Sequence, residues 1–210
     1  MFKTSAIVLS PGRTGSVLLA QNLSKSFGVP GQVKYFYEHD LDLSSLNQGR
    51  IVGHSHNLFE PNHLSDVLPV YSVRRNLTET LLSNYLASVH HCYHLESKDP
   101  DPDFAPVEVN SYWMETIIEQ HRVWFDHYKK LLDHDSLVVI YEMMVDYLYH
   151  PSQGYKPLYP NKSTRILDYD SVLDWLNRRI PDTLIQDHMT FIDYSIRPAG
   201  ELYQWAAGLR

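Results

Sequence analysis

The chain has little of what secreted, membrane-spanning and nucleic-acid-binding proteins depend on. Its single cysteine, Cys92, excludes an internal disulfide framework and fits a reducing compartment. No apolar run is long enough for a signal peptide or a bilayer span. The formal net charge of −7 argues against a nucleic-acid partner, which normally meets a basic face. We therefore expect a soluble, cytoplasmic protein with no membrane span and no nucleic-acid partner.

Alternating strand and helix patterns predict the fold class. Five short apolar runs predict strands at 5–10, 32–37, 50–54, 68–73 and 136–141. The first and last runs are almost continuously apolar, which is typical of strands buried on both faces of a parallel sheet. Helical spacing of apolar residues covers 15–27, 77–89, 117–131 and 172–180. The pattern predicts an α/β protein whose mainly parallel central sheet is flanked by helices in a three-layer sandwich, as one domain over residues 1–210.

A short polar loop with two glycines follows the first predicted strand, in the stretch Ser10–Leu19. The N–H groups at a helix start have no partner within the helix, and the helix dipole is positive there, so the loop predicts an anion site. It is not a Walker A loop, because Gly12 and Gly15 are three apart and no lysine follows. The stretch indicates a phosphate-like ligand other than ATP.

A second candidate anion site follows the fourth predicted strand. Asn76 is placed to cap a helix, with Glu79 three residues later as in a capping box. Ser83 lies about two turns further along, where the side chain of Arg75 can lie beside it. A surface arginine and a tolerated helix serine explain this spacing equally well. Both sites, however, follow the ends of strands that should be neighbours, where open α/β sheets bind ligands. A ligand with two separated anionic groups would fit both.

With these motifs in order, the chain resembles the sulfotransferases that use 3′-phosphoadenosine 5′-phosphosulfate (PAPS). Gly12–Leu19 resembles their 5′-phosphosulfate loop, and Arg75-Asn76…Ser83-Asn84-Tyr85 resembles their 3′-phosphate motif. Ile140–Met144 resembles a Tyr-Glu-Asp-Leu segment that ends a late strand. The resemblance covers about residues 5–145, and it implies that PAPS contacts Arg13, Thr14, Gly15, Ser16, Val17, Arg75, Ser83 and, at the adenine, Tyr141. A strand-end tyrosine is also common in a core.

The chain departs from the family pattern at several points. Arg13 stands where the animal cytosolic enzymes have lysine, although bacterial members also use arginine. Val17 replaces a hydroxyl residue. The C-terminal Arg-Lys-Gly segment has no clear counterpart, so Arg197 is left out of the expected site.

The resemblance implies transfer of a sulfuryl group to a hydroxyl or amine of a small molecule or glycan, leaving adenosine 3′,5′-bisphosphate. Arg13 would stabilise the charge that grows on the leaving phosphate oxygen, and no metal is expected. A base near neutral pH is needed for the acceptor. His56 is favoured; His54 qualifies because the alignment slips by one residue, and Glu38 stands where other branches use a glutamate.

Two other functions remain open from the sequence. One is an atypical nucleotide or nucleoside kinase with a degenerate phosphate loop, which would bind ATP with magnesium. The other is a non-catalytic nucleotide-binding module that keeps both anion sites without a working base.

Overall fold

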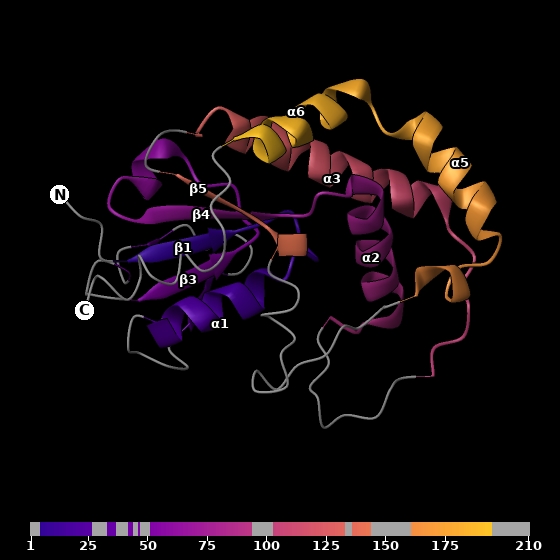
Figure 1. Cartoon of the computed structure of the whole chain (residues 1–210), viewed down its shortest axis with the longest axis horizontal. Helices are drawn as coiled ribbons and strands as arrows, with labels where there is room; N and C mark the ends of the chain where they lie inside the picture. Colours follow the sequence, from indigo (N-terminus) through magenta and orange to yellow (C-terminus); the bar gives the residue numbers. More distant parts are fainter. Residues whose placement is uncertain are drawn as a thin grey trace.

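A parallel five-stranded sheet forms the centre of the protein (Figure 1). The computed structural model describes residues 5–26, 33–36, 42–43, 46, 51–93, 103–132, 136–143 and 161–194. The strands are β1 (Ala6–Leu9), β2 (Val33–Phe36), β3 (Val52–Ser55), β4 (Leu68–Val73) and β5 (Leu137–Ile140). They pair in the order β2-β3-β1-β4-β5, and every pair is parallel. The predicted α/β class and parallel sheet are confirmed.

Both faces of the sheet are covered by helices, which explains the continuous apolar runs. Successive strand residues point to opposite faces, so Ala6 and Val8 pack with α1 (Ser16–Ser26). Ile7 and Leu9 belong to the larger core on the other face. That core is built with α2 (Leu77–His90), α3 (Ser111–Lys129) and α6 (Asp182–Asp193), while α5 (Tyr169–Arg179) contacts α2. These layers form the predicted sandwich.

The strand order places the loop after β1 at the centre of the carboxyl edge of the sheet. β1 pairs with β3 on one side and with β4 on the other. The chain leaves β1 toward α1 on one face, whereas after β4 it continues through α2, beyond the strand ends, to α3 on the opposite face (Figure 1). In open α/β sheets, ligands bind outside the strand ends at such a reversal of direction.

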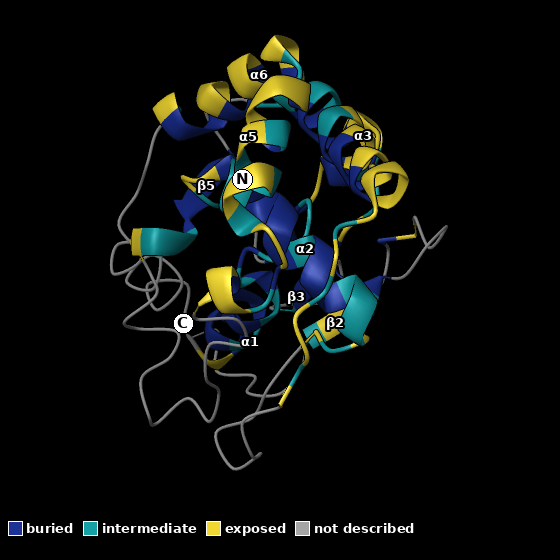
Figure 2. Ribbon diagram, turned by 90° about the vertical axis from the view of Figure 1, so that its right-hand side faces the viewer, coloured by how far each residue is buried: buried dark blue, intermediate teal, exposed yellow. Residues whose placement is uncertain are grey.

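An aromatic cluster fills the larger core. The ring of Tyr71 on β4 lies 5.3 Å from that of Tyr128, 6.2 Å from that of Trp124 and 5.6 Å from that of Phe191, measured between centroids. Figure 2 shows the buried inner faces of the helices and the exposed residues on their outer faces. The aromatic residues of α3, namely Trp124, Phe125 and Tyr128, are therefore part of the core.

The helical layer extends beyond what apolar spacing predicts. α3 begins at Ser111, where the side chain of Asn110 accepts a hydrogen bond from the amide of Trp113. The helix α6 was not predicted. Its inner face includes the buried polar residues Asp187 and His188, which interrupt the apolar pattern that reveals an amphipathic helix.

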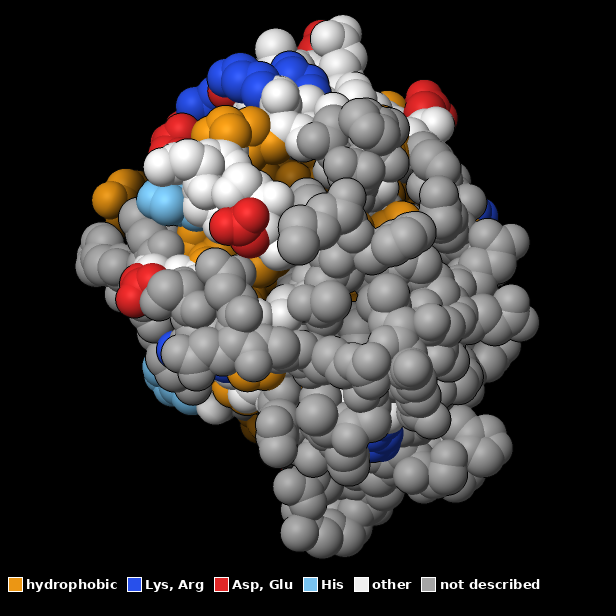
Figure 3. All heavy atoms as spheres, turned by 90° about the vertical axis from the view of Figure 1, so that its left-hand side faces the viewer, with side chains coloured by type: hydrophobic (Ala, Val, Ile, Leu, Met, Phe, Trp, Pro, Cys, Tyr) orange, Lys and Arg blue, Asp and Glu red, His pale blue; other side chains and the backbone are white. Residues whose placement is uncertain are grey.

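Basic side chains on one face of the protein lie beside acidic ones (Figure 3). At the end of α3, Lys129 is 2.5 Å from Asp187 and Lys130 is 2.8 Å from Asp126. These lysines are paired and do not offer a basic surface. None of the described helices is both long enough and apolar enough to cross a bilayer.

Candidate functional site

The loop between β1 and α1 is held in a conformation that few residues adopt. Its φ angles are 106° at Gly12, 55° at Arg13 and 69° at Gly15. Arg13 is therefore left-handed, which costs an L-residue about 1 to 2 kcal/mol. A Cβ on Gly12 would lie 3.3 Å from the side-chain amide of Asn84, so the loop passes close to α2. This tight path brings the loop and α2 together.

The start of α1 presents amides beside this loop. The first helical hydrogen bond runs from the Leu19 N–H to the Gly15 carbonyl at 2.9 Å. The N–H groups that precede Leu19 therefore have no acceptor within the helix. The Ser72 hydroxyl of β4 donates to the Thr14 carbonyl at 2.9 Å and anchors the loop. The Thr14 hydroxyl is fully buried and has no partner among the described residues. Gly15 and Val17 are partly exposed. The backbone at the start of α1 is thus partly exposed, as anion binding at a helix N-terminus requires.

Arg13 connects the two predicted anion motifs. Its Nε–H donates to the Ser83 hydroxyl at 3.5 Å, although the residues are 70 apart in the sequence. Another guanidinium N–H of Arg13 donates to the carbonyl of Tyr93, directly after α2. The sequence predicts that the side chain of Arg75 lies beside Ser83, and it gives no sign of the contact between Arg13 and Ser83. Arg75 is exposed, and its guanidinium has no ion pair with a described residue.

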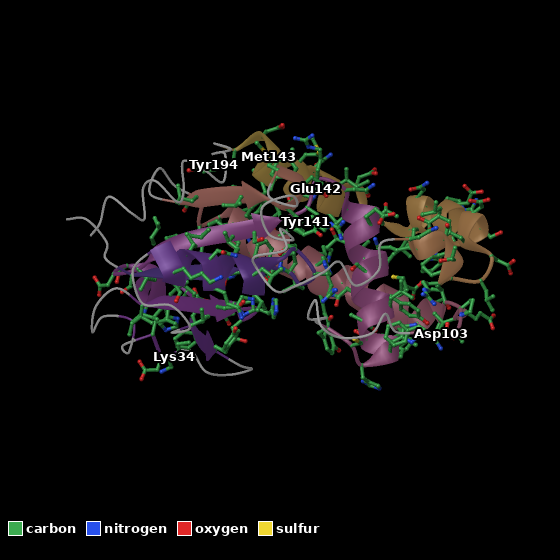
Figure 4. The ribbon with its side chains drawn as sticks, turned by 60° about the horizontal axis from the view of Figure 1, so that its bottom comes forward. Lys34, Asp103, Tyr141, Glu142, Met143 and Tyr194 are labelled. Atoms are coloured by element: carbon green, nitrogen blue, oxygen red, sulfur yellow. The ribbon has the colours of Figure 1, made fainter. Side chains whose placement is uncertain are left out.

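The turn before α2 is fixed by a residue that sequence reasoning did not assign to the site. Glu142, in the 3₁₀ turn η3 (Tyr141–Met143) after β5, accepts from the Arg75 amide at 2.7 Å. Its other oxygen lies 3.5 Å from Nε of Arg74. Figure 4 shows Glu142 between the end of β5 and the start of α2. Its position in the tyrosine-glutamate segment directly after a buried strand is the feature of the sequence that could have indicated a role for Glu142 in the site.

Tyr141 lies in the same turn, and one face of its ring is in contact with another side chain. The Arg74 guanidinium stands over it, 4.5 Å from the ring centroid. The predicted contact of Tyr141 with an adenine stays a prediction. Arg74 is further held through its carbonyl, which accepts from Nε2 of His188 at 2.7 Å.

His56 reaches the loop from the end of β3. Its Nδ1 is 2.8 Å from the Ser10 carbonyl and 3.1 Å from the Ser10 hydroxyl. Because a carbonyl only accepts, we assign the ring proton to Nδ1, which leaves Nε2 with a lone pair. The side chain is solvent-exposed, yet the protein around it reduces solvation enough to lower the pKa of His56. Arg13 lowers the pKa further, while the bond to Ser10 opposes both effects.

His54 lies beneath the loop rather than at its surface. It is buried on the α1 face, with Nε2 at 2.9 Å from the Ser16 hydroxyl. Ser16 is also bonded to the Ser10 hydroxyl at 3.0 Å, and so its hydroxyl is engaged within the protein. This geometry gives His54 a supporting position and leaves His56 as the more accessible base. The third candidate, Glu38, lies outside the described residues.

No family model, curated protein or solved structure matches this chain. Among the described residues, no group of three or more histidines, cysteines and carboxylates is arranged to hold a metal ion.

Proposed function

We propose that this protein is a sulfotransferase that moves a sulfuryl group from PAPS to a hydroxyl or amine of a small molecule or glycan. The observation that carries the proposal is the 3.5 Å contact between Arg13 and Ser83. These residues belong to two motifs that resemble the two phosphate-binding segments of that family. Their contact supports one ligand with two anionic ends at the carboxyl edge of the sheet.

The loop after β1 is suited to the end of the ligand where charge develops. When bound, PAPS supplies the activated sulfuryl group. Arg13 and the amides of Gly15–Val17 would hold the 5′-phosphosulfate, and Arg13 would stabilise negative charge on the departing oxygen. Ser83 and Arg75 would hold the 3′-phosphate. Positioning and fixed charge are what in-line transfer of this kind requires.

His56 is suited to accept the proton of the acceptor. Its Nδ1–H donates to the Ser10 carbonyl, so Nε2 is the basic nitrogen, and the lowered pKa keeps the ring neutral near pH 7. Ser10 thus orients the base while the loop that follows Ser10 holds the nucleotide. This arrangement favours a catalytic protein over a silent binding module.

Calorimetric titration with adenosine 3′,5′-bisphosphate and with ATP–magnesium tests the proposal. We expect the bisphosphate to bind more tightly, and Arg13→Ala to weaken it by about 10-fold or more, because a charged hydrogen-bond donor is lost. Arg122→Ala is the matched control, since that exposed arginine pairs with Glu119 on α3.

Transfer is then measured with radiolabelled PAPS and a panel of hydroxyl and amine acceptors. A preference for ATP–magnesium would replace the proposal with the kinase alternative. Tight bisphosphate binding without transfer to any acceptor would instead support the non-catalytic module.

A further inference from the structure

A carboxylate stands in the middle of the proposed 3′-phosphate subsite. Glu79 and Ser83 lie one turn apart on α2, and Arg75 directly precedes the N-cap residue Asn76. Sequence reasoning assigned Glu79 to a capping box. In the structure Asn76 does cap the Glu79 amide at 3.0 Å, but the Glu79 carboxylate accepts from Lys162 and, at 3.2 Å, from the Tyr169 hydroxyl. An unbalanced carboxylate one turn from Ser83 would repel a phosphate.

Lys162 comes from a distant segment and is buried against this face. It begins the 3₁₀ turn η5 (Lys162–Thr164), and only 8% of its side chain is exposed. The segment is fixed behind it, because Arg165 closes the turn onto the Lys162 carbonyl at 2.9 Å and Ile166 forms a bridge with Val107. The lysine is therefore placed by the fold and not by a flexible tether.

The charge around this pair is positive in sum. Arg13, Arg74, Arg75 and Lys162 are four cations, and Glu79 and Glu142 are two carboxylates, so the balance is +2. Burial lowers the pKa of Lys162, and the nearby charges of Arg74 and Arg13 lower it further, while Glu79 raises it. Although partial burial works to raise the pKa of Glu79, its bond to Lys162 holds that pKa below the usual value. Without Lys162 the balance would fall to +1, and the Glu79 carboxylate beside Ser83 would have no cation bonded to it among the described residues.

We propose that Lys162 gives the start of α2 its affinity for a phosphate group by neutralising Glu79. The inference rests on the proposed function for the identity of the nucleotide, but its electrostatic logic applies to any phosphate at this face. Lys162 acts through Glu79 and is a positioning residue. Its removal exposes the ligand to the Glu79 charge, and removal of both charges restores a neutral surface beside Ser83.

A double-mutant cycle of Lys162→Met and Glu79→Gln tests this role by calorimetry with adenosine 3′,5′-bisphosphate. We expect Lys162→Met to weaken binding by about 10-fold, Glu79→Gln to bind at least as tightly as the wild type, and the double variant to return to within about threefold. A double variant as weak as Lys162→Met would overturn the inference, because the lysine would then contact the ligand itself.

The controls address folding and general charge effects. Lys129→Met removes a lysine at the end of α3 that pairs with Asp187 of α6, and it should leave the affinity unchanged. If Lys162→Met does not fold alone, the comparison of Glu79→Gln with the double variant carries the test. Equal affinities support the inference, and a tenfold loss in the double variant contradicts it.

Inorganic pyrophosphate separates this inference from the proposed function. If wild-type protein binds pyrophosphate with the expected cycle but does not bind the bisphosphate, the inference stands and the sulfotransferase proposal fails. If the bisphosphate binds without the cycle, the inference alone fails. Binding of neither probe overturns both.

Discussion

At the scale of single residues, the site depends on how the protein sets the state of His56. The Ser10 carbonyl selects the tautomer, and the surrounding protein together with Arg13 favours the neutral ring. Burial makes the largest contribution to this lowered pKa, and the arginine that is expected to hold the nucleotide adds to it.

The pH dependence of sulfuryl transfer tests this state. A base acts unprotonated, so kcat/KM should fall as pH drops through the lowered pKa of His56, with the midpoint of the fall below pH 6.5, the ordinary histidine value. His56→Gln should reduce transfer by about 100-fold or more while leaving bisphosphate affinity intact. The exposed residue His91, replaced by Asn, is the control. An inflection above pH 6.5 would contradict the assignment.

At the scale of elements, Glu142 joins the end of β5 to the first turn of α2. It accepts from the Arg75 amide at 2.7 Å and faces Arg74 at 3.5 Å. Backbone donors before a helix need partners, and this carboxylate supplies one from a neighbouring strand end. The orientation of α2, and with it of Ser83, therefore depends partly on β5.

Glu142→Ala should lower the free energy of unfolding by about 1 kcal/mol, because a partly exposed charged hydrogen bond is lost. Chemical denaturation measures this change. Glu115→Ala is the matched control: its pair with Arg179 spans 4.0 Å between exposed side chains, so its effect should stay within about 0.5 kcal/mol. Equal losses in the two variants would show that Glu142 makes no special contribution.

At the scale of the whole molecule, a buried histidine couples stability to pH. His121 on α3 is 1% exposed, its Nδ1 lies 2.9 Å from the Ile117 carbonyl, and its Nε2 has no partner among the described residues. Burial lowers the pKa of His121 from 6.5 to about 4, and the charges of His56 and His188 act in the same direction. Between pH 6.5 and pH 4, His121 is therefore mostly protonated in the unfolded chain and mostly neutral in the folded protein.

The free energy of unfolding should accordingly fall as pH decreases from 6.5 toward 4. For these two pKa values, the His121 contribution between pH 7 and pH 5 is about 2 kcal/mol. Denaturation of wild type and His121→Leu at both values isolates it, since His56 and His188 titrate in both proteins. The variant should lose less stability on acidification. An identical loss in both would mean that His121 is protonated in the folded state.

Much of the architecture follows from local pattern. The run Leu137–Ile140 is apolar throughout because both faces of the sheet are covered, and that pattern is legible without tertiary information. Asn76 caps α2 as its position before a helical run predicts. α6 was missed because its inward face includes Asp187 and His188, whose burial depends on partners elsewhere in the fold, such as Lys129 and Arg74.

The sequence alone determined that two polar loops follow buried strands and lead into helices, since strand, glycine turn and helix cap are encoded within a few residues of one another. Only the tertiary structure decided that Arg13 lies at Ser83, that Glu142 fixes the Arg75 turn, and that Lys162 neutralises Glu79. Each of these contacts joins residues far apart in the chain. Charges on separate segments become partners only when the sheet order and the helix packing bring them together. The spacing of residues within one segment therefore cannot predict these contacts.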